Sequence, residues 1–243
     1  NKSHIYDVWN HILRALQLSA DKKWPLEIRL SALFHDIGKP ESRRFSNESK
    51  DFTFYGHEVI GARIVKNVLE DLKFSKEIIE KVEKLVRWHM FFSDTEQITL
   101  SAVRRMIVNV GKENIWDLMN VRVTDRIGMG RPKEDPYRLR KYHAMIDEAM
   151  QDPISVGMLK IDGNDLIKMG IAPGPKIGNI LHALLEKVLD NPKENTVENL
   201  TNMAKNMANL SNEELVKIGE DGKEKKEIEA KKQVKEIRKR HKV

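Results

Sequence analysis

Apolar side chains recur at helical spacing along most of this sequence, and this pattern restricts the fold more than any other feature. Residues 6–18, 26–37, 56–72, 75–90, 100–110 and 114–128 each carry apolar positions three or four residues apart, which is the repeat of an amphipathic helix. We find no convincing run of alternating apolar and polar residues, the repeat of a half-buried strand. The sequence therefore predicts an all-α fold.

Turn-forming and capping residues indicate where these helices begin and end. Gly38 and Pro40 are expected to end the second helix at residue 37, and Gly111 separates the helices on either side of it. Ser75 is expected to cap the helix that follows it. Residues 41–55 are polar and charged, which indicates a loop or flap.

A second unit is expected to begin near Pro153. Within it, Asp162-Gly163 marks a turn, and Gly170 with the "APGP" stretch at 172–175 separates a short helix from a longer amphipathic one. The segment "GIAPGPKIGNIL" is either a helix-hairpin-helix turn, whose glycine amides can meet a nucleic-acid phosphate, or a tight connection between packed helices. We expect domains at 1–150 and 151–210 and a charged helical tail at 211–243.

The composition limits the class of protein. The 243-residue chain has no cysteine, which excludes disulfides and thiolate ligands. It has no apolar run of about 18 residues that would predict a membrane span. The net charge of +6 favours phosphate-bearing partners, although much of the excess follows Lys223, where it fits a solvated helix or frayed tail. We expect a cytoplasmic protein, and because the first residue is Asn1 we expect a piece of a longer polypeptide.

Histidine and aspartate side chains lie on the apolar faces of several predicted helices. His11 follows Val8 by three residues, and His57 precedes a stripe that includes Ile60. Gly61, one turn after His57, would leave space for a metal or a substrate. Six such residues lie on five predicted helices: His11, His35, Asp36, His57, His89 and Asp125.

Burial of these polar groups needs a reason. A buried imidazole or carboxylate is costly unless it is paired or coordinated. One such histidine alone would be interpreted as a core or surface residue, but six inward-facing ligand groups predict a shared centre for one or two divalent metal ions. Nitrogen and oxygen donors without a thiolate suit Mn, Fe, Co, Ni, Mg or Zn.

These residues, in this order, resemble the HD superfamily of metal-dependent phosphohydrolases, which carries an adjacent His and Asp like His35 and Asp36. The resemblance implies an HD-domain helical bundle with a metal centre. The residues that would bind one metal are His11, His35, Asp36 and Asp125, and those that would support a second are His57 and His89.

A narrower resemblance extends from about His4 to Pro192. "HIYDVWNHILRAL", "ALFHDIGKP", "AVRRMIVNVG" and "IDGNDLIKMGIAPGPKIGNILHALLEKVL" are similar to the HD-bearing C-terminal half of bacterial tRNA nucleotidyltransferases and poly(A) polymerases. It implies a small helical RNA-binding-like subdomain after the bundle. Arg104 and Arg105 resemble a paired-arginine motif of this family, and either RNA contact or internal ion pairing would explain them. The family's nucleotidyltransferase head has a Gly-rich turn and paired strand aspartates, and neither is found here. We therefore expect that the chain does not add nucleotides by itself.

The resemblance also suggests roles in catalysis. Asp36 is the best candidate to bridge two metals, which would activate water for in-line attack on phosphorus. Lys39 could reach a phosphate oxygen or be a solvated lysine, and Arg126 could neutralise substrate charge. Glu58 could orient a ligand histidine or be an exposed glutamate. The candidate catalytic residues are therefore Asp36, Lys39 and Arg126.

Two functions remain open at this point. The first is a metal-dependent phosphohydrolase or phosphodiesterase that acts on nucleotides or on terminal, including 2′,3′-cyclic, phosphates of RNA. The second is a non-catalytic tRNA-binding scaffold half of a CCA-adding enzyme whose nucleotidyltransferase head is missing from this chain. The complete set of ligand residues favours the first, because a site that has lost its activity has no reason to keep every coordinating side chain.

Overall fold

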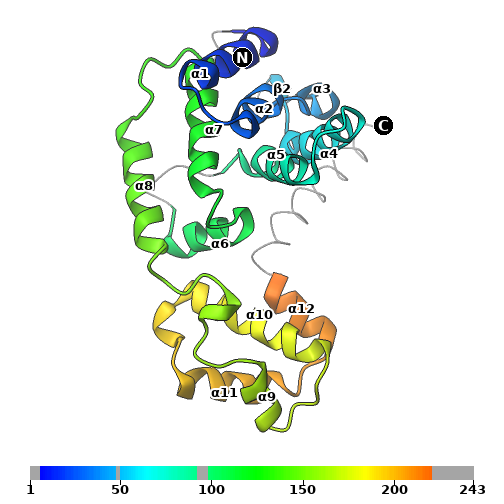
Figure 1. Cartoon of the computed structure of the whole chain (residues 1–243), viewed down its shortest axis with the longest axis vertical. Coiled ribbons are helices and arrows are strands. Elements are labelled where there is room, and N and C mark those ends of the chain that lie inside the picture. The colour runs from blue at the N-terminus through cyan, green and yellow to red at the C-terminus, as the bar shows by residue number, and fades with distance from the viewer. Residues whose placement is uncertain (1–5, 48–49, 92–97, 221–243) are drawn as a thin grey trace. The chain divides into compact units, whose positions relative to one another are not determined.

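A computed structural model describes residues 6–47, 50–91 and 98–220 of the chain (Figure 1). Within these residues the secondary structure is helical apart from one two-stranded sheet. The predicted all-α class is thus confirmed, with a small hairpin added to it. None of the helices in these ranges is both long and apolar enough to cross a membrane.

The chain divides into two compact units, and each is described by itself. The first contains the described residues up to 91 and residues 110–140, and the second contains residues 98–109 and 141–220. The predicted boundary near residue 150 and the predicted tail from residue 211 stay predictions. The charged run after Lys223 lies outside the described residues.

The first unit is a bundle of helices around a buried aliphatic core. Helix α1 (Val8–Asp21) packs against α2 (Leu26–Phe34) and α7 (Ile115–Gly128). Helix α4 (His57–Asp71) packs against α5 (Lys76–Trp88), and α5 also contacts α2 and α7. Figure 1 shows these helices grouped around α2. The core side chains include Ala15, Ile28, Ala32, Val65, Val82 and Val121, all fully buried.

The second helix is shorter than the sequence predicts. Helix α2 ends at Phe34 instead of residue 37, so that His35 and Asp36 lie in the turn that follows it. Pro40 does not follow the helix end but lies in the first turn of a short helix, α3 (Lys39–Ser42), where a proline needs no amide donor. The predicted cap at Ser75 is confirmed, because its side chain accepts a hydrogen bond from the Ile78 amide.

The segment predicted as a loop at 41–55 contains a hairpin. Strands β1 (Arg44–Ser46) and β2 (Asp51–Thr53) pair antiparallel, with Phe45 opposite Phe52. The two rings make an edge-to-face contact with centroids 5.5 Å apart. A strand of three residues is too short to show an alternating pattern, so the sequence pattern did not indicate this hairpin within the predicted loop or flap.

The second unit is also helical. Its elements are α6 (Leu100–Val110), most of α8 (Tyr137–Ala149), a 3-10 turn (Val156–Met158), α9 (Gly163–Lys168), α10 (Pro175–Asp190), a second 3-10 turn (Pro192–Glu194), α11 (Val197–Met207) and α12 (Asn212–Glu220). Asp162 caps α9 through a capping box, so Asp162-Gly163 begins a helix instead of forming an isolated turn. The predicted stripe of α10 is buried at Ile180, Leu184 and Val188.

The paired arginines of α6 form ion pairs inside this unit. Arg104 is 7% exposed; it donates to the Asp152 carboxylate at 2.7 Å and to the Leu189 carbonyl at 3.0 Å. Arg105 contacts Glu186 at 2.8 Å and Asp190 at 2.7 Å. Internal ion pairing therefore accounts for both guanidinium groups.

Candidate metal centre

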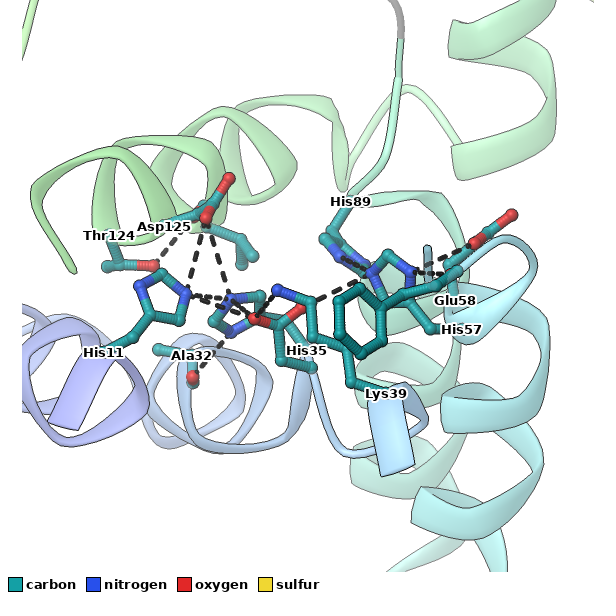
Figure 2. Close-up of polar contacts among 12 residues, drawn as sticks. His11, Ala32, His35, Lys39, His57, Glu58, His89, Thr124 and Asp125 are labelled. Carbon is teal, nitrogen blue, oxygen red and sulfur yellow. Dashed lines mark hydrogen bonds and ion pairs between the residues drawn. The ribbon is translucent and has the colours of Figure 1, made fainter. Parts of the chain in front are cut away.

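The structure brings the six predicted ligand residues together from distant parts of the sequence (Figure 2). His11 comes from α1 and Asp125 from α7, while His57 is the first residue of α4. His35 follows α2 directly and His89 follows α5 directly. None of the six is more than 5% exposed. Bulk water is thus largely excluded from a cluster of imidazoles and carboxylates.

One half of the cluster gathers around His11 and His35. Their Nε2 atoms lie 2.9 Å apart. Asp36 Oδ2 lies 3.3 Å from His11 Nε2 and 3.4 Å from His35 Nε2, and Asp125 Oδ1 lies 3.5 Å and 3.8 Å from the same two atoms. His11, His35 and Asp36 offer ligand atoms close enough together to hold one metal ion.

The other half of the cluster gathers around His57 and His89, whose Nε2 atoms lie 3.2 Å apart. Asp36 Oδ1 lies 3.3 Å from His57 Nε2, so the second oxygen of the same carboxylate faces this half. Asp36, His57 and His89 form a second group that could hold a metal ion. Asp36 is the residue that the two groups share, which is the arrangement needed to bridge two ions.

Backbone carbonyls orient three of the imidazoles. The Nδ1 atoms of His35, His57 and His89 lie 2.9 Å, 2.8 Å and 2.7 Å from the carbonyl oxygens of Ala32, Phe54 and Val86. A carbonyl can only accept a hydrogen bond, so each Nδ1 carries the hydrogen, and in the neutral ring each Nε2 presents a lone pair to the cluster. The lone pairs of neutral His57 and His89, whose Nε2 atoms lie 3.2 Å apart, repel each other unless a cation lies between them. This donor set fits a divalent metal ion.

The charges within the cluster favour the ligand form of Asp36 and His89 and the protonated form of His35. Burial raises the pKa of Asp36, but His35 and the neighbouring histidines outweigh it and hold that pKa well below its usual range. Burial, with the fields of His35 and His57, lowers the pKa of His89 to about 3. Burial lowers the pKa of His35 as well, yet Asp36 and Asp125 raise it overall. Asp36 is therefore ionised and His89 neutral near neutral pH, as metal ligands must be.

Two polar side chains adjoin the cluster. Lys39 is not a solvated lysine, because its side chain is 12% exposed and its Nζ donates to Asp36 Oδ2 at 2.6 Å. Glu58 Oε2 lies 3.8 Å from His57 Nδ1, too far for a hydrogen bond, and the nearer Phe54 carbonyl orients that ring instead. Lys39 thus places an ammonium group directly against the carboxylate that both halves share.

Arg122, which the apolar pattern of the sequence did not indicate, contacts a ligand residue. Its Nη1 donates to Asp125 Oδ2 at 2.5 Å. Burial raises the pKa of Asp125, but the charge of Arg122, together with His35 and His89, outweighs it and lowers that pKa overall. The i to i+3 spacing of Arg122 and Asp125 on one helix was the signal that could have revealed this pair. Arg126 instead donates its Nε hydrogen to the Lys133 carbonyl at 2.6 Å, and no direct contact joins it to the six residues.

Gly61 does not leave space for a metal or a substrate, contrary to the prediction. A Cβ atom built there would meet the Gly38 nitrogen and Val86 Cγ1, each at 3.4 Å. The room beside α4 is filled by the turn that carries His35 and Asp36. The neighbouring turn thus occupies the space next to Gly61.

Comparison with known proteins agrees with this geometry. The family model described as "HD domain" matches residues 8–127. Residues 8–127 form an HD domain. This match contains all six residues of the candidate centre and ends close to the end of α7. The predicted HD-domain bundle and the resemblance to the HD superfamily are confirmed.

The similarity to named relatives extends beyond the HD domain. The CC-adding tRNA nucleotidyltransferase of Thermus thermophilus is 35% identical over 186 residues, which is 75% of this chain and 41% of the relative. The A-adding tRNA nucleotidyltransferase of Deinococcus radiodurans is 25% identical over 189 residues, 75% of this chain and 43% of the relative. A multifunctional CCA protein of Neisseria meningitidis is 27% identical over 148 residues, 58% of this chain and 34% of the relative. The chain thus spans less than half the length of these relatives.

Proposed function

We propose that this HD domain is a metal-dependent phosphohydrolase or phosphodiesterase that acts on nucleotide or RNA-terminal phosphoesters, including 2′,3′-cyclic phosphates. The main support is the position of Asp36, whose two carboxylate oxygens face two separate groups of histidine nitrogens. Relatives named as tRNA nucleotidyltransferases support RNA as the substrate and, with it, a cytoplasmic location.

The proposal assigns the six residues of the centre to one or two divalent ions. His11, His35 and Asp125 would hold one ion, His57 and His89 a second, and Asp36 both. Mn, Fe, Co, Ni, Mg and Zn all suit such nitrogen and oxygen donors. A divalent cation supplies a Lewis acid for the phosphoryl oxygens and makes water acidic enough to act as a nucleophile near neutral pH.

The chain's own residues supply orientation and charge. Carbonyls hold the imidazole rings in place through Nδ1, and burial of the cluster strengthens its electrostatic interactions. Lys39, held at Asp36, would place its ammonium group beside a phosphate oxygen. Arg126, one residue beyond Asp125, would neutralise charge on the rest of the substrate.

Metal analysis combined with a panel of phosphoester substrates tests this function. We expect the purified chain to bind Mn, Co or Ni and to hydrolyse a generic phosphodiester or a 2′,3′-cyclic nucleotide. Asp36→Ala should lower both metal content and hydrolysis, the latter by about 100-fold or more, because it removes the ligand that the two groups share.

A matched variant controls for the loss of a negative charge. Asp71→Ala removes an exposed carboxylate at the end of α4 and should leave metal content and hydrolysis unchanged. The proposal fails if Asp36→Ala retains the metal and the hydrolytic activity of the unaltered chain.

A second function, tRNA binding without catalysis, has support of its own. The similarity to the Thermus and Deinococcus relatives covers 75% of the chain and therefore extends beyond the HD domain. In this alternative the chain is a scaffold that holds tRNA for a nucleotidyltransferase. Binding of tRNA to metal-stripped protein at low salt tests it, and undetectable binding would count against the scaffold function.

A further inference from the structure

Four arginines line a single cavity at the end of the HD domain. The cavity has a volume of about 430 Å³ and lies between the end of α7, the connection after it and the first turn of α8. We call it the arginine pocket, and its charged lining residues are Arg122, Arg126, Arg131 and Arg138. No carboxylate is among its lining residues. A concave site of this charge is suited to an anion.

Most of this positive charge is not neutralised by the protein. Arg122 pairs with Asp125, and Arg126 uses its Nε hydrogen on a backbone carbonyl. Within the described ranges, no carboxylate lies at ion-pair distance from the guanidinium groups of Arg126, Arg131 or Arg138. These planar donors match phosphate oxygens in geometry as well as in charge.

Arg122 connects the arginine pocket to the candidate metal centre. It lines the pocket and donates to Asp125 Oδ2 at 2.5 Å, while Asp125 Oδ1 lies 3.5 Å from His11 Nε2. An ion pair therefore links the lining of the pocket to a residue of the centre. A chain of phosphates with one member at the centre could place the next member in the pocket.

An aromatic ring completes the lining. Tyr137 is the first residue of α8, lines the pocket and is 64% exposed. An exposed aromatic ring beside cationic side chains is the combination by which proteins bind single-stranded nucleic acid, because the ring stacks on a base while the cations hold the backbone. A free phosphate ion would make no use of such a ring.

We propose that the arginine pocket holds the backbone phosphate next to the reacting phosphoester of a single-stranded RNA end. This inference rests on the proposed function and adds that the substrate is an oligonucleotide and not a mononucleotide. Arg131 and Arg138 hold the neighbouring phosphate, and Tyr137 stacks on the base beside it.

Substrate preference tests the inference. The probes are a trinucleotide that ends in a 2′,3′-cyclic phosphate and the matching 2′,3′-cyclic mononucleotide. The unaltered chain should prefer the trinucleotide in kcat/KM. The double variant Arg131→Gln/Arg138→Gln should reduce this preference about tenfold or more, since each lost charged hydrogen bond to phosphate weakens binding by about this order. The double variant Arg63→Gln/Arg140→Gln removes the same charge from arginines that do not line the pocket, and should keep the preference.

A binding measurement separates failure of the pocket from failure of the hydrolase function. Fluorescence anisotropy with a labelled single-stranded RNA hexamer carrying a 3′-phosphate should show about tenfold weaker binding to the pocket variant than to its control, with a shallower salt dependence. If the chain hydrolyses nothing but this difference appears, the proposed function fails and the pocket stands. Equal binding by both variants, or inorganic phosphate that competes as well as the hexamer, overturns the inference.

Discussion

Gly128 lets α7 pass close to His11 of α1. A Cβ atom at residue 128 would lie 2.8 Å from both His11 Nδ1 and the His11 carbonyl oxygen. Such contacts are repulsive, so any larger residue must displace either the imidazole or the helix. The side chain at position 128 thus controls the position of a proposed ligand without being a ligand itself.

Gly128→Ala should weaken the binding of Mn²⁺ about tenfold or more. Displacement of a ligand should weaken metal binding at least as much as the loss of a residue that orients a ligand. Gly178→Ala on α10 is the matched control, since its Cβ would meet nothing within 4 Å. That control should stabilise its helix by up to about 1 kcal/mol and leave Mn²⁺ affinity unchanged. Isothermal titration measures both affinities, and equal values for the two variants would contradict this role of Gly128.

Arg104 is a structural residue of the second unit. Its guanidinium is buried between the Asp152 carboxylate and the Leu189 carbonyl. Arg104→Ala should lower the free energy of unfolding by about 2–4 kcal/mol, because it leaves both partners without their donor. Urea denaturation measures this loss. Weaker tRNA binding by the variant at unchanged stability would assign Arg104 to RNA contact instead.

At the scale of the elements, a turn between α2 and α3 positions the centre. Gly38 in this turn lies against the start of α4, where a Cβ would come 2.1 Å from the His57 carbonyl oxygen and 2.7 Å from the Gly61 nitrogen. This close approach places Asp36, two residues earlier, beside His57. The contact is between backbones, so neither side can yield by a rotamer change.

Gly38→Ala should therefore destabilise the protein by about 2–4 kcal/mol, the range for an unrelieved steric conflict. Gly61→Ala faces the same turn from α4 but would make only contacts of 3.4 Å or more, and helix propensity favours alanine. We expect it to change stability by less than about 1 kcal/mol. Denaturant midpoints of the two variants check this contrast, and a Gly38→Ala variant as stable as Gly61→Ala would show that the turn can move away.

The apolar periodicity of the helices predicted the position of the candidate ligands better than the glycine and proline residues predicted where the helices end. His11, His57 and Asp125 lie on the apolar faces of their helices. All three are buried, as their positions on those faces predict. The end of α2 was misplaced because Ile37 continues the apolar pattern through a turn that is no longer helical. Arg122 was missed because only apolar spacing was used to place side chains, although its i to i+3 spacing from Asp125 on one helix indicates the pair.

At the scale of the whole molecule, the proposed centre draws on residues more than a hundred positions apart in sequence, from His11 to Asp125. A metal held by all of them would link α1, α4, α5 and α7 within the first unit. The second unit, which contains α10 and α11, contributes none of the six residues. Metal binding should therefore stabilise one unit selectively.

Removal of metal with a chelator should speed amide hydrogen exchange in α1 and α7 and leave α10 and α11 unchanged. The stabilisation should reach about 2.7 kcal/mol when the free metal concentration is a hundred times its Kd. Hydrogen-exchange mass spectrometry on metal-loaded and metal-stripped samples provides the comparison. Uniform changes in both units, or no change in either, would disagree with a centre confined to the first unit.

Anomalous diffraction from crystals grown with Mn²⁺ is the most direct test of whether the six clustered residues bind metal ions. We expect one or two anomalous peaks inside the histidine cluster, about 2 Å from Nε2 atoms and from Asp36 oxygens, as expected for bonded nitrogen and oxygen ligands. At least one peak should contact Asp36. Well-ordered side chains of His11, His35, Asp36, His57, His89 and Asp125 with no anomalous peak among them at saturating Mn²⁺ would contradict it.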